Sequence, residues 1–276
     1  MPINDRAQLF RSLHTAVNPL RLANAWDVAS ARVIESIGAT AIATTSAGVA
    51  WSLGSPDGDE LDRDRALDLI ARIVTAVGVP VTADIESGFG ASPEAVATTI
   101  AGVLDAGAVG VNLEDSLRGG PSPLRPAQEQ AERLAAARGA ADETGVELYI
   151  NARIDTFLRL SDPAGRLDET LSRAETYLAA GADGIFVPGV VDPTTVAALV
   201  DGIAAPLNIL AGPGSPDLGA LGALGVARVS LGSSIAAAAY AVARRAAEEF
   251  FTTGTYSSLA GALAYGEINE LLRKHA

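Results

Sequence analysis

Residues 81–90 read Val81-Thr82-Ala83-Asp84-Ile85-Glu86-Ser87-Gly88-Phe89-Gly90, a short apolar run that ends in acidic residues and glycines. Side chains alternate faces along an extended strand, so we expect Asp84 and Glu86 to point the same way. The glycines that follow allow the backbone to turn tightly and leave room for a ligand. The pattern predicts a strand whose end carries a pair of carboxylates.

A second run, Gly110-Val111-Asn112-Leu113-Glu114-Asp115, has the same form. If neighbouring strands bring the two runs together, Asp84, Glu86 and Glu114 form an oxygen-rich pocket. Such a pocket suits a hard cation, with Mg²⁺ as the first choice and Mn²⁺ as the alternative, because these ions prefer carboxylate and water oxygens. Either run alone is better explained by solvated acids at a strand end. Their joint occurrence predicts a metal site at Asp84, Glu86 and Glu114.

Both runs belong to a pattern that repeats along the chain. After a predicted leading helix over 4–16, eight apolar runs alternate with helix-like segments. The apolar runs are 20–23, 41–44, 79–83, 109–113, 147–150, 184–187, 207–210 and 228–231. The helix-like segments are 27–37, 61–77, 93–106, 127–144, 165–181, 193–203, 216–224 and 233–250. This alternation predicts parallel strands joined by helices, and eight units predict a closed (β/α)8 TIM barrel of the α/β class.

The chain contains no linker and no shift in composition that would divide it. We therefore expect one barrel domain over residues 1–276, with a C-terminal helical extension from about residue 233 to residue 276. The Ala/Leu/Tyr face of residues 256–276 could pack on a neighbouring subunit or on its own barrel.

Composition limits the partners. The 276 residues are 49% hydrophobic and carry a formal net charge of −13, which argues against nucleic acid and anionic membranes. A small anionic substrate is still allowed, because a metal and one arginine can reverse the local field. The absence of cysteine excludes disulfides, thiolate zinc sites and cysteine nucleophiles. The N-terminus lacks the apolar core of a signal peptide and no apolar stretch could span a bilayer, so we expect a cytoplasmic protein.

Polar residues fall where the strands of such a barrel end, which is where its active site lies. The predicted rim contains Asn24, Asp27, Thr45, Ser46, Asp84, Glu86, Glu114, Asp115, Asn151, Arg153, Pro188, Gly189 and Gly212. The planar fork of Arg153 can bind a carboxylate or phosphoryl group, although a structural ion pair with a neighbouring acid is the open alternative. The turn Thr45-Ser46-Ala47-Gly48 offers backbone N–H groups to an anion. Asp57 lies on a long loop that could close over the pocket.

The sequence offers few residues for other kinds of catalysis, such as histidine acid–base chemistry or a lysine Schiff base. The two histidines are His14 in the leading helix and His275 at the tail, and the one lysine is Lys274. No P-loop or dinucleotide fingerprint is present. The residues therefore favour metal-assisted chemistry on a small oxygenated anion, in which a metal and arginine stabilise an enolate or oxyanion.

Six motifs, taken in order and spacing, resemble the isocitrate lyase/phosphoenolpyruvate mutase superfamily along most of the chain. They are Asn24-Ala25-Trp26-Asp27, Thr45-Ser46-Ala47-Gly48, Gly54-Ser55-Pro56-Asp57, Asp84-Ile85-Glu86-Ser87-Gly88-Phe89-Gly90, Asn112-Leu113-Glu114-Asp115 and Asn151-Ala152-Arg153-Ile154-Asp155. The resemblance implies a Mg²⁺-dependent barrel, usually a tetramer, in which subunits exchange a C-terminal helix. It also implies that C–C or P–C bonds of 2-oxo acids and related carboxylates are made or broken through an enolate.

The resemblance also implies roles for particular residues. Asp84 corresponds to the direct metal ligand and a contact of the substrate, and Glu86 and Glu114 to acids that hold the metal largely through water. Ser46, Ala47 and Gly48 correspond to the turn that binds the substrate carboxylate and oxo group. Asp57, Glu114 and Arg153 are the residues implied to act in catalysis, Asp57 from the mobile loop and Arg153 as the clamp on the anionic substrate.

The loop after the fourth strand departs from the better-known subgroups. It reads Ser116-Leu117-Arg118-Gly119-Gly120-Pro121-Ser122-Pro123-Leu124, with neither the cysteine of isocitrate-type lyases nor the lysine and Asn-Ser pair of phosphonate enzymes. A lyase mechanism that uses that thiol is excluded. We expect a Mg²⁺-dependent lyase or decarboxylase acting on a small 2-oxo or hydroxy acid, oxaloacetate being one candidate. The alternatives are a phosphonopyruvate hydrolase or phosphoenolpyruvate mutase type of enzyme, and a non-catalytic barrel that binds small carboxylates. A homo-oligomer, either a tetramer or a dimer, is expected.

Overall fold

The computed structural model describes residues 1–118 and 122–273, so Lys274 and His275 lie outside the described residues. Nine strands form one parallel sheet in the order β1-β9-β8-β7-β6-β5-β4-β3-β2. They are β1 (Leu20–Leu22), β2 (Asn24–Ala25), β3 (Ile42–Thr44), β4 (Val81–Asp84), β5 (Gly110–Glu114), β6 (Tyr149–Arg153), β7 (Gly184–Val187), β8 (Leu207–Leu210) and β9 (Arg228–Ser230). Only Ala23 separates β1, which pairs with β9, from β2, which pairs with β3. The predicted first strand is therefore split in two, and its two halves bring the ends of the sheet together into a nearly closed barrel.

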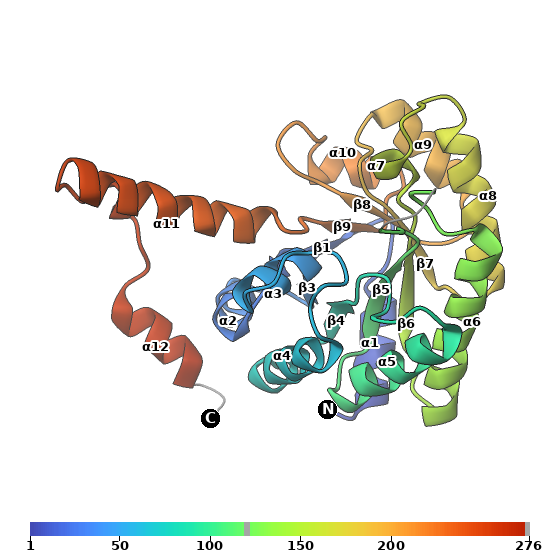
Figure 1. The fold of residues 1–276 in the computed structure, drawn as a ribbon, viewed down its shortest axis with the longest axis horizontal. Coiled ribbons are helices and arrows are strands. Elements are labelled where there is room, and N and C mark those ends of the chain that lie inside the picture. Colours follow the sequence, from blue (N-terminus) through green and yellow to red (C-terminus); the bar gives the residue numbers. More distant parts are fainter. Residues whose placement is uncertain (119–121, 274–276) are drawn as a thin grey trace.

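Most helices lie around the outside of this sheet, whereas the C-terminal segment extends away from it (Figure 1). The helices of the described residues are α1 (Ile3–Ser12), α2 (Val28–Ser36), α3 (Ser46–Ser52), α4 (Arg63–Ala76), α5 (Pro93–Asp105), α6 (Ala127–Thr144), α7 (Thr156–Arg159), α8 (Arg166–Ala179), α9 (Pro193–Gly202), α10 (Leu218–Ala223), α11 (Ser234–Thr252), the 3-10 helix η1 (Ser257–Leu259) and α12 (Tyr265–Arg273). The predicted TIM barrel is confirmed. The short helices α3 and α7 were not predicted as helices.

Local sequence signals explain where several helices begin and end. Ser92 caps α5, its hydroxyl accepting a hydrogen bond from the N–H of Ala95, and Pro93 occupies the first turn, where no N–H is needed. Gly145 ends α6 with φ +72°, a conformation that glycine adopts without steric cost. Such start and stop signals keep the connecting loops short, so that each helix leads the chain back to the next parallel strand.

Helix α1 covers the amino-terminal end of the barrel. Phe10 and His14 both contact the ring of Tyr149 at the start of β6, His14 stacked at 3.9 Å between centroids and Phe10 edge-on at 5.6 Å. Arg11 holds the same end through Asp183, just before β7, at 2.8 Å. Because this end is closed by packing, the carboxyl ends of the strands are left for a site.

The C-terminal segment leaves the barrel. Helix α11 projects away from the other elements in Figure 1, and Ala236 is its one fully buried residue. Helix α12 returns to α2, where the Nε of Arg32 donates to the carbonyl of Leu271 at 2.9 Å. Among the described residues, no helix is both long and apolar enough to cross a membrane.

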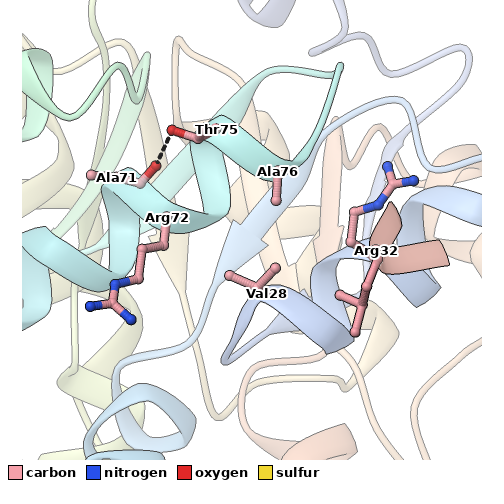
Figure 2. A pocket seen from close by; sticks show the side chains of 7 residues that line it. Val28, Arg32, Ala71, Arg72, Thr75 and Ala76 are labelled. Atoms are coloured by element: carbon pink, nitrogen blue, oxygen red, sulfur yellow. Dashed lines mark hydrogen bonds between the residues drawn. The ribbon is translucent and has the colours of Figure 1, made fainter. Parts of the chain in front are cut away.

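A shallow pocket of about 370 Å³ lies between α2, α4 and α12 on the outside of the barrel. Figure 2 shows its lining, which consists of Val28, Arg32, Ala71, Arg72, Thr75, Ala76 and Leu272. The pocket lies against helices rather than at the strand ends, and no acid is present in its lining. It therefore does not belong to the predicted acid cluster.

Candidate active site

Asp84 ends β4, and Glu86 lies in the turn that follows. The backbone of Glu86 has φ +52°, which is costly for a residue other than glycine, of order 1–3 kcal/mol. The turn is held by its own hydrogen bonds, since Thr44 Oγ1 accepts from the Asp84 N–H at 2.9 Å and Asp84 Oδ1 accepts from the Glu86 N–H at 3.2 Å. The strand thus ends before Glu86, and the alternation of an extended strand is not what orients its side chain, contrary to our argument from sequence.

The Glu86 carboxylate is bound by a neighbouring loop. Its Oε2 accepts the backbone N–H of Gly58 at 2.9 Å and also that of Asp59. Asp59 in turn accepts the N–H of Ser87 at 3.2 Å, so that the two segments hold each other. The loop that carries Asp57 is therefore attached to the predicted metal site through its backbone.

Glu114, at the end of β5, pairs with Arg153 at the end of β6. The two residues are register partners, and Arg153 Nη1 lies 2.7 Å from Glu114 Oε2. Arg153 also holds Asp155 through both carboxylate oxygens, with Nε–Oδ1 at 2.6 Å and Nη2–Oδ2 at 3.0 Å. All three nitrogens of the guanidinium thus have an acidic partner, which leaves at most two of its five N–H groups for a ligand.

Burial dominates the electrostatics of the acids. It raises the pKa of Glu86 to about 7 and that of Glu114 to about 8, although the charge of Arg153 acts in the opposite direction on Glu114. Burial also raises the pKa of Asp84, against the charge of Arg153. For Arg153, burial acts to lower the pKa, but the charges of Glu114 and Asp155 outweigh it and raise the pKa. The cluster thus has more buried acid than one arginine neutralises.

Two carboxylate oxygens of the cluster are free acceptors. Glu86 Oε1 and Glu114 Oε1 are buried and have no hydrogen-bond partner among the described residues. A buried acceptor without a donor is costly, and a divalent cation would both coordinate such oxygens and offset the excess negative charge. The donor set therefore fits a hard cation. Within residues 1–118 and 122–273, however, no three His, Cys, Asp or Glu side chains are gathered into a preformed metal cage.

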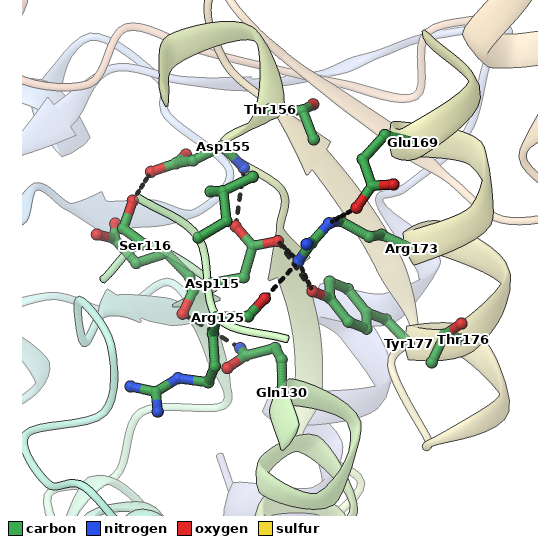
Figure 3. A network of polar contacts seen from close by, with 12 residues as sticks. Asp115, Ser116, Arg125, Gln130, Asp155, Thr156, Glu169, Arg173, Thr176 and Tyr177 are labelled. Carbon is green, nitrogen blue, oxygen red and sulfur yellow. Dashed lines mark hydrogen bonds and ion pairs between the residues drawn. The ribbon is translucent and has the colours of Figure 1, made fainter. Parts of the chain in front are cut away.

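A buried network holds Asp155, the partner of Arg153, in place, and Figure 3 shows it around Asp115 and Asp155. Asp115 accepts the Asp155 N–H at 3.0 Å, Arg173 Nη1 at 3.0 Å and the Tyr177 hydroxyl at 2.9 Å. Ser116 donates its hydroxyl to Asp155. Because Asp155 is held from two sides, it can fix the orientation of the guanidinium that it binds.

The predicted turn at Thr45–Gly48 is the first turn of α3. Thr45 precedes the helix, and the N–H groups of Ser46, Ala47 and Gly48 are first-turn donors that have no acceptor within the helix. Gly48 is tightly enclosed, since a Cβ placed there would lie 2.8 Å from Thr45 Cγ2 and 2.8 Å from Trp26 Cβ. The position and the free donors are compatible with the predicted contact with an anion.

Asp57 faces Arg118 rather than the acids. Arg118 Nη2 lies 3.5 Å from Asp57 Oδ2, and the guanidinium lies over Gly58, where a Cβ would meet its Cζ at 2.4 Å. The charge of Asp57 nevertheless contributes to the raised pKa of Asp84, although less than burial does. Asp57 is therefore close to the cluster but is engaged by the loop after β5.

Two of the predicted rim residues have structural roles instead. Asp27 caps α2 in a reciprocal pair with Ser30. Asn24 donates to the carbonyl of Thr44 and accepts the N–H groups of Leu231 and Gly232, which ties the split first strand to both of its neighbours. Conversely, the sequence analysis assigned no role to Asp155 or to the network of Asp115, Arg173 and Tyr177 that holds it. The spacing of Arg153 and Asp155, two residues apart at a strand end, was the available signal.

Comparisons with known proteins agree with this architecture. The profile of the phosphoenolpyruvate phosphomutase family matches residues 10–251. An uncharacterised Mycobacterium tuberculosis protein is 41% identical over 239 residues, covering 86% of this chain and 87% of its own. An oxaloacetate decarboxylase from Bradyrhizobium is 29% identical over 254 residues, covering 88% and 84% respectively.

Solved structures also match this chain over nearly its whole length. A candidate lyase/mutase from Burkholderia cenocepacia superposes with a TM-score of 0.89 at 40% identity, covering 97% of this chain and 95% of that one. A phosphonopyruvate hydrolase in complex with oxalate and Mg²⁺ superposes with a TM-score of 0.83 at 25% identity, covering 96% and 94%. The chain belongs to the isocitrate lyase/phosphoenolpyruvate mutase superfamily, whose enzymes include lyases, mutases and hydrolases.

Proposed function

We propose that this protein is a Mg²⁺-dependent carbon–carbon lyase that decarboxylates or cleaves a small 2-oxo or hydroxy acid of the oxaloacetate type. The observation that carries the proposal is the cluster of the half-buried Asp84 with the buried Glu86 and Glu114, which has two carboxylate oxygens without a partner among the described residues and lies next to Arg153. The oxaloacetate decarboxylase relative and the Mg²⁺ complex of the hydrolase structure support it by similarity.

Asp84, Glu86 and Glu114 would hold the metal, Asp84 directly and the two glutamates largely through water. Mg²⁺ keeps several of its water ligands, so a site without a preformed cage of side chains is compatible with it. Mn²⁺ prefers the same oxygen ligands and could replace it. When bound, the metal supplies positive charge that stabilises an enolate oxygen.

The chain's own residues bind and orient the substrate. The first-turn N–H groups of Ser46, Ala47 and Gly48 would bind the carboxylate next to the oxo group, and the remaining N–H groups of Arg153 would bind an anionic oxygen. For oxaloacetate, the bond between C3 and the distal carboxylate breaks, CO₂ leaves, and the electron pair forms the enolate. A proton then returns to C3. That proton can come from a water molecule, and Glu114, paired with Arg153 at 2.7 Å, would position this water beside the acid cluster.

Asp57 would act from the loop that it shares with Gly58 and Asp59. Those two N–H groups bind Glu86, so movement of the loop is coupled to the acid cluster. Release of Asp57 from Arg118 would let the carboxylate turn toward the substrate, since their contact is a single one of 3.5 Å. In the alternative chemistry, a phosphonopyruvate hydrolase or mutase, Asp57 would be the nucleophile or base.

A turnover assay separates the candidates. Pyruvate and CO₂ formed from oxaloacetate, at a rate that depends on added Mg²⁺ and is abolished by a chelator, would support the proposed lyase. Oxaloacetate decarboxylates slowly in solution with Mg²⁺ alone, so the Asp84→Asn variant is the matched blank. Phosphate release from phosphonopyruvate would instead assign the hydrolase chemistry. Binding of oxalate without turnover of any 2-oxo acid would leave a carboxylate-binding barrel.

We also infer self-association, as a tetramer or dimer, from the exposed C-terminal arm, by which we mean residues 234–273 with α11, η1 and α12. Phe251 is 80% exposed and Phe250 is 55% exposed near the end of α11, and Tyr265 at the start of α12 is 86% exposed. Large apolar side chains gathered on one projecting segment are typical of a surface that a second copy covers. The arm is long enough to reach beyond the barrel that carries it (Figure 1).

A further inference from the structure

A second pocket, of about 460 Å³, lies beside the acid cluster on the outer side of the loop that holds Glu86. Its lining comes from three segments that follow strand ends. The lining residues are Gly58, Asp59, Leu61, Arg63, Ser87, Phe89, Gly90, Ala91, Ser116, Leu117, Arg118 and Arg125. Three of them are arginines, and among the described residues that line the pocket Asp59 is the one acid. In a chain with a net charge of −13, this is a locally positive site.

The three guanidinium groups are not used to hold the pocket together. Arg63 pairs with its exposed sequence neighbour Asp64 at 2.9 Å, and Arg125 pairs with Glu129 four residues along. Arg118 alone reaches across to another wall, through its 3.5 Å contact with Asp57. Each guanidinium is thus paired through one nitrogen with an acid outside the lining, and its other N–H groups are not engaged by that acid.

Two observations show that the pocket is built and is not a chance gathering of surface arginines. Arg125 is 7% exposed, and its buried Nε has no hydrogen-bond partner in the part of the chain that the structure describes. Gly58, with φ +118°, leaves space for the Arg118 guanidinium, which a Cβ at this position would meet at 2.4 Å. The burial of Arg125 fixes its side chain at the pocket wall, although the enclosed Nε is not itself open to a ligand.

We propose that this pocket binds a carboxylate or phosphoryl group through Arg63, Arg118 and Arg125. Guanidinium groups suit such anions because their N–H groups match the spacing of the anionic oxygens. Ser87 lies in the same lining, and its hydroxyl can add a neutral hydrogen bond, whereas the hydroxyl of Ser116 already donates to Asp155. The cationic side chains of the loop after β5, which lacks the cysteine and lysine of related enzymes, are Arg118 and Arg125, so the loop that departs from the family supplies two of the three cations.

The anion could come from two sources with the same chemistry. One is a second anionic group of the substrate itself, because Gly58 and Asp59 line the pocket and also bind Glu86 of the acid cluster. The other is a free anion that binds beside the substrate. The first source rests on the proposed function, whereas the existence of the anion site does not.

The site is tested first without metal or turnover, by calorimetric titration of inorganic phosphate into the full chain. We expect binding of one phosphate, weakened about threefold to tenfold by Arg118→Ala and by Arg63→Ala, and weakened less by Arg118→Lys, which keeps the charge but not the fork of N–H groups. Arg11→Ala is the matched control, because Arg11 has a similar exposure, 39% against 37% for Arg118, but lies at the opposite end of the barrel. Added chloride should weaken the binding, since partly exposed charges are screened.

Steady-state kinetics then separates the sources. If the pocket takes part of the substrate, phosphate inhibits competitively, and Arg118→Ala raises KM for a substrate with a second anionic group more than for one without it. If it takes a free anion, phosphate changes the rate without competing. Either kinetic pattern supports the anion site. The proposal is overturned if phosphate does not bind the wild-type protein, or if phosphate binds Arg118→Ala, Arg63→Ala, Arg118→Lys and Arg11→Ala equally. Because the titration needs no catalysis, this result is independent of whether the lyase proposal fails.

Discussion

Asp155 grips the guanidinium of Arg153 through both carboxylate oxygens, at 2.6 and 3.0 Å, and so presents the remaining side of Arg153 to Glu114. The arginine that we predicted to bind the substrate anion is thus itself held in one orientation by an acid. Such preorganisation fixes the direction of the remaining N–H groups before any ligand binds, and reduces the cost of ordering them.

We predict that Arg153→Lys lowers kcat/KM at least about a hundredfold. An ammonium group cannot keep both the two-pronged contact with Asp155 and the contact with Glu114, so one buried acid loses its partner. Arg138→Lys is the matched control, because Arg138 also binds an acid, Asp183, but does so at the opposite end of the barrel. Steady-state kinetics, with the substrate that the turnover assay finds, measures the effect, and equal losses in both variants would contradict a role specific to Arg153.

For Asp84→Asn we predict loss of Mg²⁺ binding and of activity together with a fold that is kept or stabilised. The amide keeps the shape of the side chain but cannot supply a charged ligand, and burial already penalises the carboxylate, as its raised pKa indicates. Calorimetric titration of Mg²⁺ and thermal unfolding give the two readouts. Asp192→Asn, at the exposed cap of α9, should leave Mg²⁺ binding unchanged. Wild-type Mg²⁺ affinity in Asp84→Asn would rule out Asp84 as a ligand.

Much of the barrel could be predicted from sequence because its signals are local and repeated. The runs that end at Asp84 and Glu114, and the cap and proline that start α5, each identify an element without knowledge of its neighbours. Helix α3 was missed since its first residues, Ser46-Ala47-Gly48, are small and include a glycine, which resembles a turn. The split of the first strand at Ala23 depends on closure of the sheet, a property of the whole barrel.

The candidate site was predicted less completely, because its details are tertiary. Parallel strands are enough to predict that Asp84, Glu86 and Glu114 lie near one rim. They do not predict that the Glu86 backbone adopts a left-handed conformation, or that its carboxylate accepts the N–H groups of Gly58 and Asp59. Those partners lie 27 and 28 residues away in a loop whose path no local pattern fixes.

The raised pKa values predict how the metal-free protein responds to pH. An acid whose pKa is higher in the folded state binds its proton more tightly there than in the unfolded state, so stability falls as the pH rises above the unfolded value. Glu86 titrates at about 7 and Glu114 at about 8. We therefore expect the Tm without metal to fall between pH 5 and pH 9, and the increase in Tm caused by Mg²⁺ to be larger at pH 9. Glu114→Gln should flatten the pH dependence, and a Mg²⁺ effect independent of pH would contradict the assignment.

The enclosure of Gly48 predicts that Gly48→Ala disturbs the start of α3. The added Cβ would lie 2.8 Å from both Thr45 Cγ2 and Trp26 Cβ, so these groups or the helix must move, at a cost of about 1–3 kcal/mol in the free energy of unfolding. Because the first-turn N–H groups move with the helix, KM should rise as well. Gly139→Ala on α6 has open space and should instead stabilise the protein by up to about 1 kcal/mol. Denaturant unfolding and steady-state kinetics distinguish the two variants.

The exposed arm predicts an assembly that a single substitution can weaken. We expect light scattering to give a mass that is two or four times the 28.0 kDa of the chain, and Phe251→Asp to shift it toward smaller species. Phe251 is 80% exposed in the single chain, so placing a charge there costs little unless a second copy covers it, in which case an unpaired charge is buried in the contact. Val17→Asp, at a residue that is 99% exposed outside the arm, is the control and should not change the mass. A monomeric wild-type protein, or an assembly that Phe251→Asp leaves intact, would show that this part of the arm is not the contact.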